Sequence, residues 1–325
     1  MSSLEESDSP KSESAREEDP KQEGSSGDQN TVQGGATNGG FIFQGGQHQV
    51  EVTQYFGVQP PTKDLDFTNE SIETEYFEPE TILIPAGTFW IGSPPGAGIP
   101  NHETPQHEVK LPAYRIGKYP VTNSQYEEFI RQTGRPVVPG MGWDGQRVPQ
   151  GFEDHPVTGV SWYEARAYCE WLSQKTGRRY SIPNEAQWEK ACRGGNNSIY
   201  PWGDKLDEKR SNHGGSSLAR VDAYPPQNEY GCFDLVGNVR QWTTTLWGEK
   251  RITPDPKFAY PWRDDQRNDI NASRQIRRVV RGSSMKDDVN LLRCSARSGQ
   301  APDDVGLPGA RHGFRVLMSV QPTRG

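Results

Sequence analysis

The sequence lacks several features that define whole classes of protein. Its cysteines, Cys169, Cys192, Cys232 and Cys294, form no CxxC pair and have no histidine at zinc-ligand spacing, which argues against a zinc site or a disulfide framework. No stretch approaches the roughly 20 apolar residues of a membrane helix, and no basic-then-apolar leader begins the chain. We therefore expect reduced, buried thiols and a cytoplasmic protein with no membrane partner.

Basic clusters and several catalytic motifs are missing as well. The net charge is −7, and no group of lysines and arginines is dense enough to follow a phosphate backbone, so we expect no nucleic-acid partner. The chain contains no GxSxG elbow, no P-loop and no GxGxxG between a strand and a helix. These absences disfavour serine hydrolases of that type and enzymes that depend on nucleotides.

Composition divides the chain into three parts. Residues 1–35 contain almost no apolar side chains, which predicts a disordered acidic tail. Residues 36–75 combine short apolar segments with glycine pairs and Pro60–Pro61, a pattern that predicts a short β segment and a linker. Within that part, residues 36–60 are candidates for pairing with the sheet edge of a protein partner. Residues 76–322 form the predicted folded domain.

Three helices can be located within this domain by their ends. Each begins with a capping box, in which the first residue caps the helix and a side chain three residues later bonds back, and each stops at a glycine. The positions are Thr122 with Gln125 and Gly134, Ser161 with Glu164 and Gly177, and Asn184 with Gln187 and Gly194. Residues 80–93, ETILIPAGTFWIGS, predict a β-hairpin. Beyond residue 195 only short β-type runs follow, so we expect an α+β fold with few regular elements and long ordered loops.

The order of these segments resembles a known family. The segments are IPAGTFWIGS, HPVTGVSWYEARAYCEWLSQKTGRRYSIPNEAQWEKACRGG, YGCFDLVGNVRQWT, RVVRGSS, RCSARS and GFRV. Together, over about residues 78–320, they resemble the formylglycine-generating enzyme (sulfatase-modifying factor) domain family. The resemblance implies a C-type-lectin-like variant fold.

Family members that are enzymes carry two copper-binding cysteines between the Gly-Gly-Ser strand and the Arg-Cys-x-x-Arg strand. In this chain the corresponding segment, MKDDVNLL, is shorter and has no thiol, so we expect no copper cofactor because Cu(I) prefers soft thiolate ligands. Cys294 matches the cysteine of the strand that follows, and we expect it to be structural. The chain is therefore a divergent member that lacks the catalytic cysteine pair.

The resemblance also implies calcium sites. The family's GNVWEW motif is GNVRQW here, so Asn238 remains while Arg240 and Gln241 replace tryptophan and glutamate. Losing a carboxylate and gaining a cation both weaken a site for Ca²⁺. Asn212 and Asp222 match a second calcium position of the family. Calcium bound by Asn238, Asn212 and Asp222 therefore stays open as a cofactor.

Two functions remain open. The first is a non-catalytic module that recognises a protein or another ligand through its C-terminal loops, as an adaptor in a bacterial signalling or conflict system or as a retroelement-diversified variable protein. The second is a metal-dependent oxidoreductase acting on a thiol substrate. For the first, the candidate ligand-binding residues are Ser284, Met285, Lys286, Asp287, Arg297, Gly299, Gln300, Asp303 and Arg311.

Overall fold

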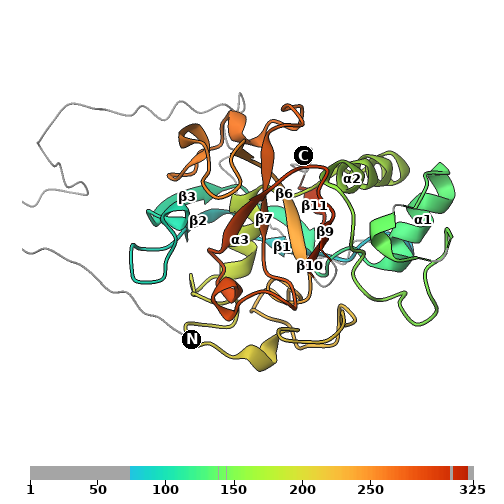
Figure 1. Cartoon of the computed structure of the whole chain (residues 1–325), viewed down its shortest axis with the longest axis horizontal. Helices are drawn as coiled ribbons and strands as arrows, with labels where there is room; N and C mark the ends of the chain where they lie inside the picture. Colours follow the sequence, from blue (N-terminus) through green and yellow to red (C-terminus); the bar gives the residue numbers. More distant parts are fainter. Residues whose placement is uncertain (1–73, 138, 144, 308–309, 321–325) are drawn as a thin grey trace, which may run out of the picture. The chain divides into compact units, whose positions relative to one another are not determined.

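The computed structural model describes residues 74–137, 139–143, 145–307 and 310–320. The predicted acidic tail and the segment 36–60 lie outside this range. Over the described residues the chain forms three α-helices, three small sheets and long connecting loops (Figure 1). The α+β class with few regular elements is thus confirmed.

The helices begin and end where their capping signals predict. Helix α1 spans Asn123–Thr133, α2 spans Trp162–Thr176 and α3 spans Glu185–Arg193, and each has both hydrogen bonds of a capping box. Gly134 and Gly177 end α1 and α2 in the left-handed conformation, which only glycine adopts without strain. Gly194 ends α3 with a positive φ of 64° but an extended ψ. The chain therefore leaves α3 in a different direction from a standard helix end.

The strands form sheets of four, five and two members. The four-stranded sheet has the order β1-β4-β11-β5 and the five-stranded sheet the order β8-β7-β6-β10-β9, while β2 pairs only with β3. All pairings are antiparallel except that of β6 with β10. The strands are β1 (Thr81–Ile84), β2 (Gly87–Ile91), β3 (His107–Leu111), β4 (Tyr114–Gly117), β5 (Tyr180–Ser181), β6 (Arg240–Gly248), β7 (Arg277–Arg281), β8 (Arg297–Gln300), β9 (Gly306–Leu307), β10 (Ala310–Gly313) and β11 (Leu317–Ser319).

The hairpin predicted for residues 80–93 is wrong in its pairing. Both strands exist, but β1 pairs with β4 and β2 pairs with β3, in separate sheets. The turn between them is held by α3, because Lys190 Nζ donates hydrogen bonds to the carbonyls of Pro85 (2.6 Å) and Gly87 (3.1 Å). Contacts distant in the sequence therefore override the local tendency of two adjacent strands to pair.

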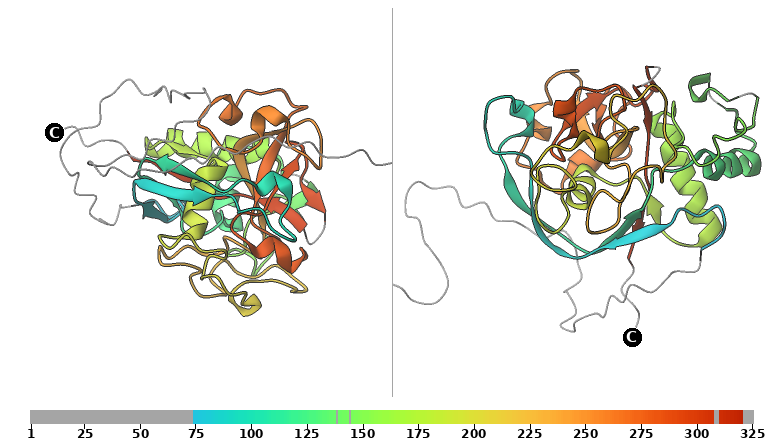
Figure 2. Two further views of the ribbon diagram at one scale, coloured as in Figure 1. Left: turned by 90° about the vertical axis from the view of Figure 1, so that its left-hand side faces the viewer. Right: turned by 90° about the horizontal axis from the view of Figure 1, so that it is seen from below.

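Two apolar clusters form the core. One packs α1 and α2 around the rings of Tyr126, Phe129 and Tyr168, at the opposite side of the fold from β2 and β3 (Figures 1 and 2). The other surrounds α3 with residues of β2, β3 and β4, and includes Trp188 and Cys294, both completely buried. Each fully buried large side chain contributes roughly 1.5–3 kcal/mol, so these clusters give the loops a rigid frame.

The described part of the chain contains no helix both long and apolar enough to span a bilayer.

Candidate ligand-binding cleft

A cleft of about 290 Å³ lies beside β8, one of the two edge strands of the five-stranded sheet. Its walls come from several separate parts of the chain: the short 3-10 helix Asn101–Glu103, both ends of β6 with the loop that follows, the end of β7, the segment around Leu291, and β8 itself. The lining side chains that matter below are His102, Arg240, Trp247, Arg251, Ile252, Arg297, Ser298, Gly299 and Gln300.

A larger cavity of about 410 Å³ lies beside α1. It is lined by Tyr76, Phe77 and the ion pair of Glu128 with Arg131, among others. None of the residues predicted from the sequence to bind a ligand borders it. The cleft at β8 is therefore the better candidate, although it is the smaller of the two.

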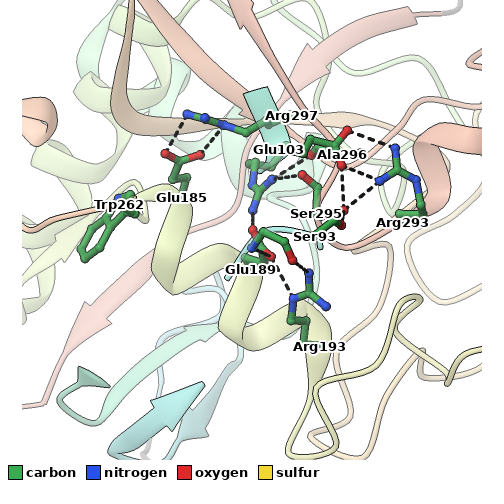
Figure 3. Close-up of polar contacts among 12 residues, drawn as sticks. Ser93, Glu103, Glu185, Glu189, Arg193, Trp262, Arg293, Ser295, Ala296 and Arg297 are labelled. Carbon is green, nitrogen blue, oxygen red and sulfur yellow. Dashed lines mark hydrogen bonds and ion pairs between the residues drawn. The ribbon is translucent and has the colours of Figure 1, made fainter. Parts of the chain in front are cut away.

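Three of the predicted ligand-binding residues meet at the cleft, namely Arg297, Gly299 and Gln300. Arg297 is buried, however, and its guanidinium pairs with Glu185 of α3, with Nη2 2.9 Å from Oε1 and Nε 2.9 Å from Oε2 (Figure 3). Its charge is thus already compensated. Arg297 therefore contributes a fixed surface of the cleft and no unpaired charge.

The other predicted residues do not line the cleft. Ser284 and Met285 are buried, while Lys286 is exposed. Asp303 is exposed and accepts a hydrogen bond from Arg274 (2.7 Å), and Arg311 lies half-buried in β10. Asp287 reaches the cleft indirectly, through its ion pair with Arg240.

The sequence did not predict the cleft residues that lie outside the C-terminal stretch. His102 lies in the segment before β3, Trp247 at the end of β6, and Arg251 with Ile252 in the loop that follows. The ring of Trp247 packs edge-on against His102, at 5.1 Å between centroids. Residues 102 and 251 carry no motif, so no local signal identifies them.

A buried ionic network adjoins the cleft through Arg297, which pairs with Glu185 and lines the cleft (Figure 3). Glu189 of α3 accepts hydrogen bonds from Arg193 Nε (2.8 Å), the main-chain N–H of Gly92 (2.7 Å) and Arg281. Glu103 pairs with Arg293, with 3.0 Å between Oε1 and Nη2, and accepts a bond from the hydroxyl of Ser295 (2.8 Å).

The three carboxylates of this network, Glu103, Glu185 and Glu189, have no exposed surface. Charges buried in this way persist only when they are paired. The network therefore connects α3, β7, the start of β8 and the segment of His102 into one unit.

Partial burial disfavours the charged form of His102. Desolvation, reinforced by the nearby positive charge of Arg297, lowers the pKa of its imidazole below the usual value. Its Nε2 lies 3.2 Å from the carbonyl oxygen of Arg297, and Arg297 Nη1 donates to the carbonyl of His102 (3.0 Å). These two contacts attach the segment of His102 to the first residue of β8.

Arg240, in the GNVRQW motif, holds the segment that follows β7. Its Nε donates to Asp287 Oδ2 (2.7 Å), and the main-chain N–H of Ser284 donates to the same oxygen (2.6 Å). Burial acts to raise the pKa of Asp287, but the bonds from Arg240 and Ser284 outweigh it and hold the pKa below its usual value. Arg240, which replaces the tryptophan of the family motif, thus has a structural role in holding Asp287.

We expect Arg240→Gln to destabilise the protein by about 1–2 kcal/mol, because it leaves the nearly buried carboxylate of Asp287 without its charged partner. Hydrogen exchange of residues 283–292 should accelerate. Arg220→Gln is the matched control, since the ion pairs of Arg220 with Asp154 and Asp222 are exposed and such pairs contribute little. Equal exchange in both variants would show that Arg240 does not hold this segment.

The predicted calcium residues are only partly brought together. Asn212 Nδ2 donates to Asn238 Oδ1 (3.0 Å), and the same oxygen accepts the main-chain N–H of Ala219 (3.0 Å). Asp222 is exposed and pairs with Arg220 (3.1 Å). The carboxylate that does reach Asn238 is that of Asp234, which accepts a bond from Asn238 Nδ2 (2.7 Å).

The comparisons with known proteins decide the family. A family model described as the sulfatase-modifying factor enzyme 1-like domain matches residues 68–320. The chain belongs to this family. The resemblance seen in the sequence is thereby confirmed.

Relatives in the sulfatase-modifying factor family include enzymes and an inactive protein. The formylglycine-generating enzyme of Bos taurus is 30% identical over 309 residues, covering 75% of this chain and 76% of that protein. The inactive C-alpha-formylglycine-generating enzyme 2 of Mus musculus is 28% identical, covering 70% and 89%. The structure of PvdO from Pseudomonas aeruginosa superposes with a TM-score of 0.61 at 25% identity, covering 75% and 96%.

The residues present do not fit the copper site that family membership implies. The segment between β7 and Cys294 has no thiol, and Asp287 within it is committed to Arg240. Cys294 is completely buried beside Cys192, and burial raises the pKa of the Cys192 thiol far above its usual value. The expectation that Cys294 is a core residue is confirmed, and all four thiols are free and buried.

Calcium fits this family member poorly but remains a prediction. The side-chain oxygen of Asn238 already accepts two hydrogen bonds, so a cation there has to displace them. Gln241, at the position of the family's glutamate, uses its Oε1 to accept from Trp188 Nε1 (2.8 Å) and Arg315 Nε (2.6 Å). Within the ranges that the structure describes, no three His, Cys, Asp or Glu side chains converge as a metal site.

Proposed function

We propose that this protein is a non-catalytic recognition module of the sulfatase-modifying factor family, and that the cleft beside β8 holds its ligand. The observation that carries the proposal is the ion pair of Arg240 with Asp287. Asp287 of this pair lies in the segment in which the family's enzymes carry their cysteine pair, and this chain has no thiol there. The inactive relative in Mus musculus supports the same reading.

The setting that fits this proposal is an adaptor that binds a protein partner in the cytoplasm. Four free, buried thiols suit a reducing compartment. A retroelement-diversified variable protein is the second form of the proposal. It requires sister copies of the chain to differ mainly at the predicted ligand-binding residues, and sequencing such copies tests it directly.

The first experiment separates recognition from catalysis. Metal content of the purified full-length protein is measured together with oxygen uptake in the presence of a cysteine-containing peptide. We expect no stoichiometric copper or iron and no peptide-dependent uptake. Stoichiometric metal with turnover would establish the competing function, a metal-dependent oxidoreductase acting on a thiol.

The second experiment tests the cleft itself. A fragment library of small organic acids, amides and aromatics is screened by ligand-observed NMR against the wild-type protein, Ser298→Trp and Ser273→Trp. Ser298 is half-buried in the cleft wall and Ser273 is exposed elsewhere. We expect fragments that bind wild type and Ser273→Trp to be lost from Ser298→Trp, because the indole fills the cleft. Fragments indifferent to Ser298→Trp would contradict the assignment of the site.

A further inference from the structure

Strand β8 has one edge that is not used by the sheet. It pairs only with β7, and Val279 of β7 lies opposite Gly299. The carbonyl of Val279 accepts a hydrogen bond from Thr243 Oγ1 of β6 (2.8 Å), so its polar main-chain groups face β6. In an antiparallel ladder, the residue opposite such a position directs its own N–H and C=O away from the pair. Gly299 therefore presents both groups to the open edge.

Arg297 confirms this alternation, because residues two apart in a strand share one direction. Its carbonyl oxygen also points away from β7 and meets His102 Nε2 at 3.2 Å. That contact closes one end of the edge. Gly299 is buried at the cleft, and no comparable contact to its N–H or C=O exists among the described residues, so these two groups lie unpaired where a ligand in the cleft can reach them.

The cleft follows this open edge. Successive side chains of a strand point to opposite faces of the sheet, yet both Ser298 and Gly299 line the cleft, so the cleft passes around the edge of the strand. A side chain at position 299 would place its Cβ 2.2 Å from Trp247 Cδ1. Glycine at this position lets Trp247 pack closely against the main chain.

The charge of the cleft is positive and only partly compensated. None of the residues that line it is acidic. Arg240 and Arg297 are neutralised by Asp287 and Glu185. Arg251 is exposed and makes no ion pair or hydrogen bond within the described part of the chain. A ligand in the cleft therefore meets one free guanidinium next to the exposed side chain of Ile252, which is 79% accessible.

We infer that the ligand is an extended polypeptide segment that adds to the free edge of β8, bonds to the main chain of Gly299, and places an acidic side chain against Arg251. This inference rests on the proposed function and names its ligand. Strand addition derives affinity from main-chain hydrogen bonds and specificity from alternate side chains. The four residues of β8 accommodate about four residues of such a segment, at roughly 3.3 Å per residue.

The test uses the full-length protein and a random library of capped nine-residue peptides. Peptides retained by wild type but not by Ser298→Trp are synthesised in three forms: unchanged, with each acidic residue replaced by its amide, and with alternate main-chain nitrogens methylated in either of the two registers. We expect the amide form to bind about three- to fivefold more weakly, as for an exposed ion pair. Methylation should weaken binding at least about tenfold in one register and less than about twofold in the other.

Arg251→Gln should remove the preference for the acidic form, while Arg263→Gln, another exposed arginine of the same loop region, should keep it. Equal sensitivity to methylation in both registers, an unchanged preference in Arg251→Gln, or the absence of any peptide retained in this way would each overturn the inference. Fragments that occupy the cleft while no peptide does would leave the proposed function standing and refute only its peptide ligand. If neither fragments nor peptides depend on Ser298, both fail.

Discussion

Replacing Glu189 by glutamine should cost about 3–5 kcal/mol of unfolding free energy, the largest effect that we expect from a single substitution in this protein. The carboxylate has no exposed surface and pairs with Arg193 and Arg281. Glutamine keeps the shape but leaves two buried guanidinium groups uncompensated, and breaking a buried pair is costly because the remaining charge cannot reach water. Urea denaturation should show a lower midpoint with an unchanged slope.

Glu170→Gln is the matched control for this experiment. Glu170 also pairs with an arginine of its own helix, Arg166, at 2.7 Å between Nε and Oε1, but both side chains are partly exposed. Such a pair contributes about 0.3–0.5 kcal/mol. A loss of less than about 1 kcal/mol in Glu189→Gln would mean that the buried ionic network beside the cleft does not depend on this charge.

Asp234 should make the stability of the protein fall as the pH rises from 4 to 8. Burial raises the pKa of this carboxyl from 3.8 to about 7, although Asn238 and Arg315 act to lower it. Between these values the folded protein holds a proton that the unfolded chain has released. The contribution of Asp234 to the free energy of unfolding is therefore complete below about pH 4 and is lost as the pH rises through about 7. A difference of ~3 units corresponds to about 4 kcal/mol at most.

The measurement compares wild type with Asp234→Asn at each pH, in the presence of a chelator. The comparison is needed because His312 also makes the stability depend on pH. Burial lowers the pKa of His312 to about 4, so its contribution to stability is lost as the pH falls from about 6.5 to 4, opposite to that of Asp234. Both proteins contain His312, so its contribution cancels in the difference. The free energy of wild type minus that of the variant should fall by up to about 4 kcal/mol from pH 4 to pH 8. A difference that stays constant would show that Asp234 is ionised throughout.

Exposed Asp264 provides the control, since Asp264→Asn should give a difference that is flat with pH. Repeating the series with calcium in place of the chelator tests the calcium prediction at the same time. Calcium that stabilises wild type at pH 7 but not Asp234→Asn would locate a cation at Asp234 and Asn238. No stabilisation of wild type would remove calcium from the candidate cofactors of this cluster.

The sequence predicted the helices well because helix signals are local. Thr122, Ser161 and Asn184 each cap a helix through a partner only three residues away, so a short window contains all the information. Strand pairing is not local in this way. The hairpin expected at residues 80–93 was wrong because its two strands pair with β4 and β3 instead, and Lys190, about 100 residues later, binds the carbonyls of Pro85 and Gly87 at the turn.

The candidate site shows the same difference between local features, which the sequence predicts, and contacts between distant segments, which it does not. Arg297, Gly299 and Gln300 were predicted because they lie in the C-terminal stretch that was expected to carry the ligand-binding loops. His102 and Arg251, which also line the cleft, come from segments some 50 to 200 residues away and carry no motif. Ser284 and Met285 were predicted for the same reason as Arg297, but packing buries them.

By itself, the sequence determined the family, the three helices and the loss of the copper-binding cysteines, because each can be read from short local segments and their order along the chain. Only the tertiary structure decided which charges face each other. Glu103 and Arg293, or Glu185 and Arg297, meet across more than 100 residues, and no spacing rule anticipates such pairs. The same holds for the cleft, since the free edge of β8 exists only because the sheet ends there, and a sheet edge is a property of the assembled fold.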